Sequence, residues 1–444
     1  MKRKLLALTL VFVLALTGCA PSASVPAEDD VTPAASGTPA TVQPVFGRKV
    51  KPAAQPTYPK SIGFDDYEGR RALWEQYPVD DALRDSIGHF SARASSLALG
   101  GSEDNALFSP ISLWFALALC AESAVGDTQT ALTDALGLTG SPSQNAKAVY
   151  NNLYKDNKIG KLKLSTSLWV NEDFPVKQDF LDLAAESFYA HSYLCDFSDA
   201  ATGKAMGDWL DEATGGLLGG QALPTDPTTL MTLFSAIHYS DQWIDEFQKS
   251  KNTTGDFHNA DGTVSQAEYM HRTYGSHGWN CGEGWLSTSL GLKNGGSMIL
   301  ILPDEGVTPG ELLSDPETLA AILSGEAEGG WGEVVIQLPR FEVSDSLDLK
   351  PVLEGLGADI VFDYTQADFS NLSEAALGLS SVRQEATLSV DEKGVTAAAY
   401  TEILYAGAAP PDGRAELILD RPFLFAVVTN GVPLFVGAVN RMEQ

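Results

Sequence analysis

The side chains of this 444-residue chain that could carry out chemistry are few and scattered. His271 and His277 form a close pair, but no carboxylate or cysteine pattern joins them in the spacing of a metal site. The sequence has no GxSxG, HExxH, Walker-type loop or GxGxxG motif after a strand. The glycine-rich stretch 214–220 follows a helical segment, which favours a helix end over an anion-binding loop. We therefore expect no ordinary enzyme, no metal and no cofactor.

The four cysteines indicate lipidation rather than a disulfide scaffold. Cys19 follows the small-residue step Leu16-Thr17-Gly18, which resembles a bacterial lipobox with Cys19 as the acylated first residue of the mature chain. The alternative is an ordinary signal peptide with a chance cysteine. Three cysteines remain, namely Cys120, Cys195 and Cys281, and an odd number cannot all form disulfide bonds with one another. Their spacing matches neither a metal-ligand pattern nor a CxxC motif.

The N-terminus has the pattern of an export signal followed by a tether. A basic start at 2–4 precedes an apolar run over 5–16, so we expect residues 1–18 to be a lipoprotein signal peptide outside the folded body. Residues 20–60 hold 8 of the 23 prolines and few large apolar side chains, a composition that cannot fold by itself. We assign 19–65 to a Pro/Ala/Ser/Thr-rich tether, with the folded domain over 66–444 starting near Tyr67.

The composition is that of an acidic globular protein. Apolar residues make up 44% and charged residues 20%, which excludes a wholly disordered or collagen-like chain. The net charge of −29 argues against nucleic acid as a partner, because phosphate binding needs a basic surface. There is no internal repeat and no second linker, so we expect one large domain and a monomer.

Helices are predicted in the first half of the domain. Residues 80–98 have apolar positions three or four apart. In 105–120, Ser109 suits the N-cap of a helix and Pro110 suits its first position. The following turns are apolar nearly all round, which is typical of a buried helix. A further helix starts at Asp127 or Thr128 and stops at Gly137.

Strands are predicted in the second half. Residues 298–302 form a continuous apolar run, 333–343 are strand-like, and 381–390 alternate with Gln384 on the apolar face. Near the end, two apolar runs flank Asn430-Gly431, a strong hairpin signal. Helices first and strands later indicate an α+β fold.

Seven segments, in order, resemble the serpin family of peptidase inhibitors and together cover roughly 80–442. The segments are 105–119, 233–247, 299–304, 336–341, 391–399, 421–425 and 434–440. The resemblance implies a large central mixed sheet, further smaller sheets and an exposed reactive loop. It also implies a function, the suicide inhibition of serine or cysteine endopeptidases. The loop is cut to the acyl-enzyme, and its N-terminal part then inserts into the main sheet as a strand, which distorts the peptidase.

The resemblance places the hinge of the loop at 391–399. Its residues are Glu392, Gly394, Val395, Thr396, Ala397, Ala398 and Ala399. Insertion requires every second side chain to enter a packed interior. With Val395 inward, the inward set continues as Ala397, Ala399, Thr401 and Ile403, which are uncharged and contain no proline. Tyr400 and Glu402 fall on the other face. The alternation favours a working inhibitor over a plain Ala-rich surface loop.

The scissile bond has two candidate positions. The family's hinge spacing, counted from Gly394, puts it at Ala408-Ala409, whereas counting back from Pro422 points nearer Pro411. Because most peptidases cleave poorly next to proline, we favour Ala408.

The predicted window is 405–411, and its residues indicate the target. The small Ala408 suits an elastase-like or subtilisin-like peptidase, and cleavage after Tyr405 would suit a chymotrypsin-like one. Arg414 as a trypsin-like site would need an unusually late bond and is our third choice.

The resemblance also identifies residues where the sheet opens to receive the loop: Ser109, Ser112, Ser235, Trp243, Gln384 and Arg340. Many serpins carry asparagine and histidine where this chain has Ser235 and Gln384. A buried Gln384 needs a partner, so we predict a hydrogen bond to Ser235 or to Ser109, the alternative being water alone. Arg340 and Glu392 occupy positions where the family often forms a salt bridge.

These expectations describe an inhibitory serpin, exported and lipid-anchored through Cys19 to the outer face of a bacterial cell membrane. Two alternatives remain. One is a non-inhibitory serpin that acts as a binding or carrier protein. The other is an unrelated lipoprotein hydrolase, which the absence of nucleophile motifs disfavours.

Overall fold

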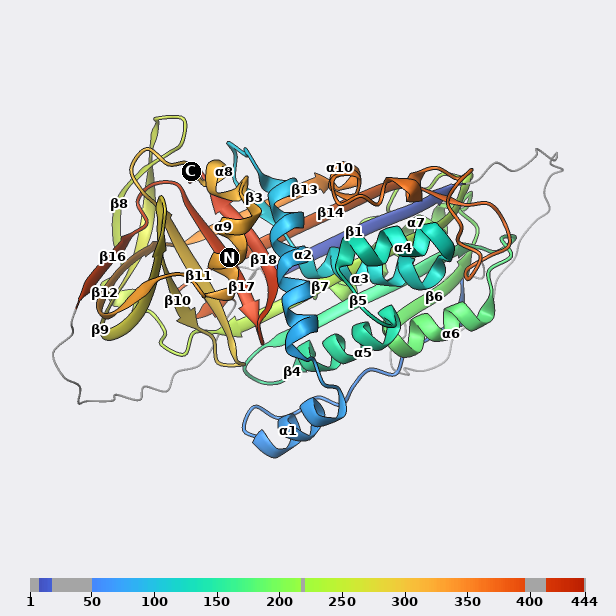
Figure 1. Ribbon diagram of the computed structural model, residues 1–444, viewed down its shortest axis with the longest axis horizontal. Coiled ribbons are helices and arrows are strands. Elements are labelled where there is room, and N and C mark those ends of the chain that lie inside the picture. The colour runs from blue at the N-terminus through green and yellow to red at the C-terminus, as the bar shows by residue number, and fades with distance from the viewer. Residues whose placement is uncertain (1–7, 18–49, 217–219, 396–412, 443–444) are drawn as a thin grey trace, which may run out of the picture.

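The computed structural model describes residues 8–17, 50–216, 220–395 and 413–442, which form two large sheets with helices packed around them (Figure 1). The helices are α1 (Tyr67–Gln76), α2 (Asp81–Leu99), α3 (Pro110–Ser123), α4 (Gly126–Leu136), α5 (Pro142–Leu153), α6 (Gln178–Ser187), α7 (Ala200–Ala213), α8 (Pro309–Leu313), α9 (Pro316–Ser324) and α10 (Lys350–Gly355), with short 3-10 turns at Lys249–Lys251 and Asp359–Phe362. The α+β class expected from the sequence is confirmed.

The main sheet has nine strands in the order β13-β14-β1-β7-β5-β6-β2, with β15 paired to β7 and β4 to β5. They are β1 (Leu8–Thr17), β2 (Lys51–Ala54), β4 (Lys155–Asp156), β5 (Lys161–Asn171), β6 (Ala190–Cys195), β7 (Thr229–Gln242), β13 (Phe341–Asp348), β14 (Gly378–Val390) and β15 (Gly394–Val395). The sheet is mixed, because β5 and β6 are parallel whereas the other pairs are antiparallel. We call the end where β7 and β14 finish the hinge end, and the opposite end the far end.

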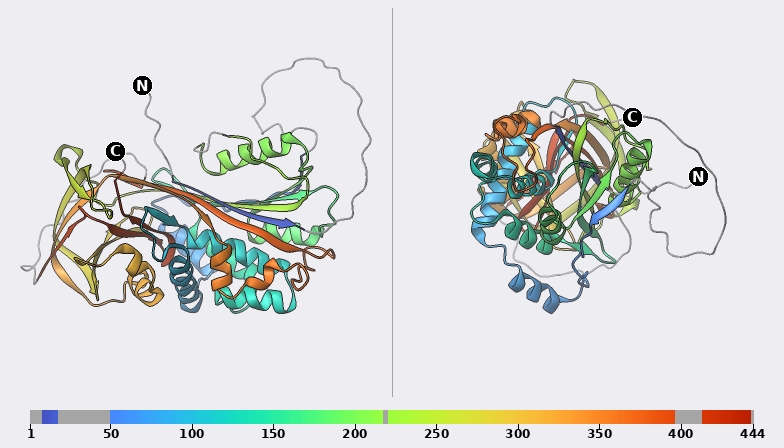
Figure 2. Two further views of the ribbon diagram at one scale, coloured as in Figure 1. Left: turned by 90° about the horizontal axis from the view of Figure 1, so that it is seen from above. Right: turned by 90° about the vertical axis from the view of Figure 1, so that its right-hand side faces the viewer.

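Helices cover both faces of the main sheet. In the left-hand view of Figure 2, the green helix α7 lies on one face of the sheet, and helices α3 to α5 lie on the other. The apolar positions of α3 that predicted a buried helix are buried nearly all round. On the α7 face a smaller core joins Trp169, Phe234 and Trp209. Each face of β7 therefore packs against a different apolar cluster.

The second sheet also has nine strands, in the order β16-β12-β9-β10-β11-β17-β18-β3, with β8 paired to β9. They are β3 (Ala106–Phe108), β8 (Thr253–His258), β9 (Val264–Gly282), β10 (Trp285–Gly291), β11 (Gly296–Pro303), β12 (Gly329–Pro339), β16 (Arg414–Ile418), β17 (Phe423–Thr429) and β18 (Val432–Val439). The predicted hairpin joins β17 to β18. Asn430 and Gly431 have φ angles of 53° and 78°, which a two-residue turn of this kind requires.

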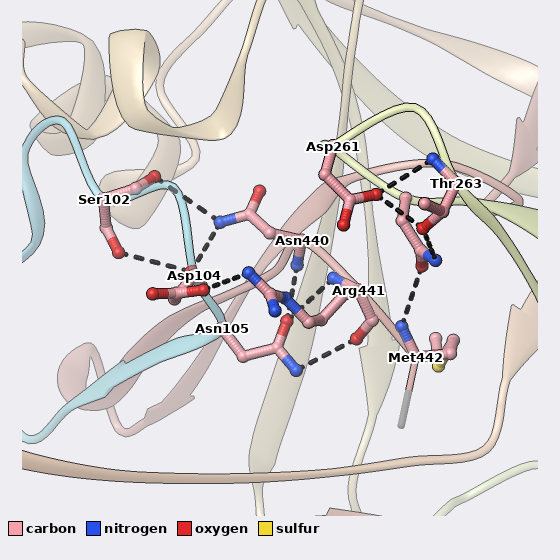
Figure 3. A network of polar contacts seen from close by, with 9 residues as sticks. Ser102, Asp104, Asn105, Asp261, Thr263, Asn440, Arg441 and Met442 are labelled. Carbon is pink, nitrogen blue, oxygen red and sulfur yellow. Dashed lines mark hydrogen bonds and ion pairs between the residues drawn. The ribbon is translucent and has the colours of Figure 1, made fainter. Parts of the chain in front are cut away.

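The end of β18 is tied to the segment that precedes α3 (Figure 3). The Asn105 side chain accepts hydrogen bonds from the backbone N–H groups of Asn440 and Arg441, at 2.7 and 2.9 Å. The Asn440 amide donates to the carbonyl of Asp104 at 2.6 Å. These contacts join two segments that lie more than three hundred residues apart, at the edge of the second sheet where β18 pairs with β3.

The N-terminal segment Leu8–Thr17 lies inside the main sheet as β1, whereas the sequence led us to expect the first residues outside the folded body. It runs antiparallel to both β7 and β14. An extended apolar segment is favoured between two strands, because both of its backbone edges find hydrogen-bond partners there. The prediction that residues 1–18 are an export signal concerns cleavage and stays a prediction.

Among the described residues that follow β1, packing against the domain starts at Val50, upstream of the expected start near Tyr67. Val50 is buried, β2 pairs with β6 at the sheet edge, and the Tyr58 hydroxyl lies 3.0 Å from Nε2 of His191. Proline is tolerated on such an edge strand, so a proline-rich segment can still dock there. The preceding part of the predicted tether, 19–49, lies outside the described residues. No helix in the described part of the chain is long and apolar enough to cross a membrane.

Candidate functional site

The predicted hinge forms a tight turn that brings the chain from the end of β14 back onto β7. Asp391 and Gly394 pair across the turn, and Gly394 and Val395 then pair with Gln242 and Asp241 of β7. Gly394 has a φ of +147°, and a Cβ there would lie 2.3 Å from the carbonyl oxygen of Asp241, so only glycine fits. Val395 is completely buried. At Gly394 and Val395 the chain thus runs antiparallel to β7.

The backbone of this turn is held by the segment that follows β7. The indole of Trp243 donates to the carbonyl of Asp391 at 2.9 Å, and the Trp243 N–H donates to the carbonyl of Lys393 at 3.0 Å. The N–H of Phe247 donates to the carbonyl of Glu392 at 2.8 Å. Three successive carbonyls of the hinge are therefore satisfied, as buried carbonyl groups must be. The role assigned to Trp243 at the opening of the sheet stays a prediction.

The predicted ion pair between Arg340 and Glu392 is present. Nε of Arg340 lies 3.7 Å from the Glu392 carboxylate, which also accepts a hydrogen bond of 2.6 Å from the Asn252 amide. Arg340 bonds the exposed Glu268 more closely, at 2.8 Å. Hydrogen bonds from Asn252 and Arg340 hold the pKa of Glu268 below its usual range. Because Arg340 is one-third exposed, we assign this network to positioning of the hinge rather than to stability.

Asp241, directly opposite Val395, is a buried carboxylate that the sequence analysis missed. It accepts hydrogen bonds from the N–H of Gln242 at 2.8 Å and from the N–H and side-chain amide of Asn294. Burial raises its pKa to about 7, although these bonds and the charge of nearby Lys155 act in the opposite direction. Burial also lowers the pKa of Lys155, to about 8. An acidic residue within the apolar alternation of 233–242 was the signal that could have revealed it.

We expect Asp241→Asn to remove a pH dependence of stability. The folded pKa of about 7 lies above the value of about 4 in an unfolded chain, so the folded state binds more protons between those values. The free energy of unfolding of the wild type should therefore fall as the pH rises through 7. Melting curves should be measured for both proteins at pH 5 and pH 8. The melting temperature of the variant should exceed that of the wild type by several degrees at pH 8 only. If the difference in melting temperature between the two proteins were the same at both pH values, Asp241 would not be the source of the pH dependence.

The polar cluster predicted beneath the sheet opening is also present. Gln384 is buried, and its side chain bonds the backbone of Ser109 twice, accepting from N–H at 2.8 Å and donating to C=O at 3.0 Å. Of the two partners predicted for Gln384, the structure shows Ser109. The Ser109 hydroxyl donates to Ser112 at 3.2 Å instead of capping α3. The hydroxyl of Ser235 is buried and has no hydrogen-bond partner among the described residues.

β15 and β1 lie end to end along β7. β15 pairs with Gln242 and Asp241, and β1 begins opposite Tyr239. β1 also lies between β7 and β14, where a strand that continued from the hinge would run (Figure 1). The sheet therefore has one strand position that begins at the hinge, and β1 fills it in this structure.

Several predicted residues lie outside the described part of the chain. They are Thr396, Ala397, Ala398, Ala399, the bond Ala408-Ala409 with its window 405–411, and Cys19. Arg414, the third choice for the scissile bond, begins β16, which pairs in parallel with β12. Its guanidinium binds Glu333 and Glu416. A side chain held in a strand and in two ion pairs is poorly placed to enter the specificity pocket of a peptidase. The structure therefore disfavours Arg414 as the residue before the scissile bond.

The two histidines of the predicted pair contact other groups of the protein. His271 bonds the Thr253 hydroxyl at 2.7 Å, and His277 stacks on Tyr274 and bonds the carbonyl of Ser289. Among the described residues, no three His, Cys, Asp or Glu side chains come together in a way that could hold a metal ion. The three cysteines in this part of the chain are free, and burial raises the pKa of Cys120 to about 12.

Comparison with known families identifies this architecture. The family model described as "Serpin (serine protease inhibitor)" matches residues 89–442. The chain belongs to the serpin family. This serpin is 30% identical to Serpin-Z2B of Triticum aestivum over 400 residues, which cover 80% of this chain and 96% of the relative. It is 27% identical to Alpha-1-antiproteinase of Mus saxicola, over 86% and 94% of the two chains.

Solved serpin structures show the same fold. The native state of tengpin, a thermophilic serpin, matches with a TM-score of 0.71 at 24% identity, covering 82% of this serpin and 95% of tengpin. Human thyroxine-binding globulin, solved with its hormone, matches with a TM-score of 0.69 at 23% identity, over 82% and 99% of the two chains. Family membership supports peptidase inhibition in general, since serpins are mostly inhibitors rather than catalysts.

Proposed function

We propose that this serpin is a suicide inhibitor of serine or cysteine endopeptidases. The nucleophile of the peptidase attacks the carbonyl of Ala408, displaces the amine of Ala409 and forms an acyl-enzyme. Water would normally hydrolyse that ester or thioester. Insertion of the N-terminal part of the loop between β7 and β14 carries the bound peptidase along the sheet and distorts its active site before hydrolysis.

The observation that carries this proposal is the geometry of the hinge. Gly394 and Val395 already pair with β7, and β1 begins two residues further along β7, opposite Tyr239. β1 runs antiparallel to β7 and β14, in the direction that a loop returning from the end of β14 would take. Insertion would thus extend an existing β ladder by ordinary strand pairing.

The target follows from the predicted bond. Alanine on both sides of the cleaved bond suits the small pocket of an elastase-like or subtilisin-like peptidase, whereas Tyr405 would suit a chymotrypsin-like one. We propose that the serpin acts as a monomer and that it is exported and lipid-anchored through Cys19 on the outer face of a bacterial membrane.

The path of the chain supports this anchoring. Lys51 lies opposite Leu194, at the far end of the sheet, whereas Gly394 lies at the hinge end. A tether that enters at Lys51 therefore leaves the hinge at the opposite end of the main sheet. The loop would face away from the membrane, where a peptidase can reach it.

Mixing the serpin with pancreatic elastase, subtilisin and chymotrypsin tests the proposal. We expect an SDS-stable adduct of the peptidase with the N-terminal fragment, together with a released C-terminal peptide whose mass identifies the cleaved bond. Cleavage within 405–411 without an adduct would mean that the serpin is a substrate of those enzymes. Such a result with every peptidase tried would contradict the proposal.

A second candidate function is a non-inhibitory serpin that binds or carries a ligand. The observation that favours it is the fold match to thyroxine-binding globulin. Under this alternative the loop would be cut without trapping the peptidase and without a gain in heat stability.

A further inference from the structure

We propose that a hollow beside Trp331, on one face of the second sheet, binds a neutral oligosaccharide. One hexopyranose ring stacks on the indole of Trp331, and its hydroxyl groups bond His277 and the serines of β10 and β11. The hollow lies on a different sheet from the hinge, so this inference goes beyond the inhibitory function and does not depend on it.

The hollow lies across strands β12, β9, β10, β11 and β17 and has a volume of about 430 Å³. Trp331 lies opposite Gly278, and Asn280, two residues further along β9, lies opposite Ser287. Because side chains alternate along a strand, this pairing sets the four positions on one face of the sheet. Residues 322–325, at the C-terminal end of α9, also line the hollow. Its size is that of a site for a small ligand.

Trp331 supplies a flat platform at this hollow. It is 64% exposed, although it is a large apolar residue. Its indole N–H donates to Oγ of Ser276 at 2.5 Å, which fixes the plane of the ring. A Cβ at Gly278 would lie 3.3 Å from the ring, so the ring rests directly on the backbone of β9. The indole is therefore held in one orientation, with much of its surface in solvent.

Polar groups with free hydrogen-bonding capacity lie beside the platform. Nε2 of His277 lies 3.1 Å from the carbonyl oxygen of Ser289 and must donate to it, because a carbonyl only accepts. Nδ1 then keeps its lone pair, and burial lowers the pKa of His277, so the ring stays neutral at pH 7. The imidazole and the Trp331 ring lie 6.4 Å apart. Among the described residues, neither Nδ1 nor the hydroxyl of Ser287, Ser289 or Ser297 has a hydrogen-bond partner.

The absence of charge in the hollow indicates a neutral ligand. The whole chain has a net charge of −29, yet none of the residues that line the hollow is an acid, a lysine or an arginine. A wholly apolar ligand would cover the serine hydroxyls and the imidazole nitrogen without bonding them, which is costly. A sugar ring meets both conditions. Its C–H face suits the negative face of an indole, and its rim of hydroxyl groups suits the serines and His277.

Calorimetric titration of the wild type with cellohexaose, maltohexaose and N-acetylchitohexaose tests the proposal. We expect at least one of these neutral chains to bind with a Kd of about 0.1–1 mM. Trp331→Ala should weaken that binding about tenfold or more, whereas Trp331→Phe, which keeps an aromatic face, should retain most of it. Failure of all three sugars to bind at about 10 mM, or equal binding by Trp331→Ala, would overturn the site.

Trp74→Ala is the matched control. Trp74 is also a partly exposed tryptophan, but it lies on α1, away from the hollow, so this variant should bind the sugar as the wild type does. Equal losses in the two alanine variants would place the sugar elsewhere. Because Trp331 is exposed, its variants should melt as the wild type does, which separates lost binding from lost folding.

His277→Phe tests the polar half of the site. Phenylalanine can still stack on Tyr274, as His277 does, but it offers no Nδ1 to a hydroxyl group. We expect a several-fold loss of affinity, and a further loss when Ser287→Ala is added. Oligogalacturonate of the same length should bind much more weakly than the neutral chain, because its carboxylates find no cation. If it bound equally well, the argument from charge would be wrong.

Sedimentation velocity distinguishes the sugar from a second copy of this chain. We expect a monomer at every concentration. A dimer that Trp331→Ala abolishes would make the hollow an interface between copies and would overturn the sugar site. None of these measurements uses a peptidase, so their outcome and that of the inhibitory function are independent.

Discussion

Replacing Ala399 by arginine should abolish trapping of the peptidase while leaving cleavage of the loop intact. If the ladder that pairs Val395 with Asp241 continued along β7, Ala399 would lie opposite Ile237, with Ala386 on the β14 side, and both of these residues are buried. A guanidinium there would be desolvated without a partner, at a cost of about 3 kcal/mol or more, which corresponds to about a hundredfold loss of insertion. Adduct yield on denaturing gels is the measurement.

Tyr400→Arg is the matched control for this variant. In the same continued ladder, position 400 would point to the other face, opposite Ala236 and the exposed Glu385, where an arginine could reach solvent and a carboxylate. We expect this variant to retain most of the adduct. If both arginine variants trapped the peptidase equally well, or equally badly, the alternation of inward and outward positions would be wrong.

Cleavage within the loop should raise the melting temperature by about 20 °C in the chain that begins at Cys19. The strand position holds ten residues of β1, so an inserted loop of that length makes about ten new hydrogen bonds at about 1 kcal/mol each. In a domain of this size each kcal/mol raises the melting temperature by about 2 °C. Calorimetry before and after cleavage by the peptidase measures this gain.

The full chain provides an internal control, because β1 already fills that position. It should melt at a higher temperature before cleavage and gain less afterwards. The cleaved Ala399→Arg variant should gain nothing. A cleaved wild type that melts no higher than the intact protein would favour the non-inhibitory carrier.

These predictions combine residues that the sequence supplied with contacts that only the fold shows. The buried helix at 110–123, the turn at Asn430-Gly431 and the alternation of 381–390 are local patterns, and a local pattern reports local structure directly. The pair Arg340–Glu392 came from the family resemblance, and the structure confirms it.

The sequence by itself determined the α+β class and the alternation of 381–390, because these depend on neighbours along the chain, whereas the position of the hinge came from the family resemblance. Only the tertiary structure decided which distant strands meet. It showed that Asp241 is buried opposite Val395, that Ser109 rather than Ser235 satisfies Gln384, and that β1 fills the strand position beside the hinge. Burial and pairing are properties of residues far apart in sequence, so no local pattern could specify them.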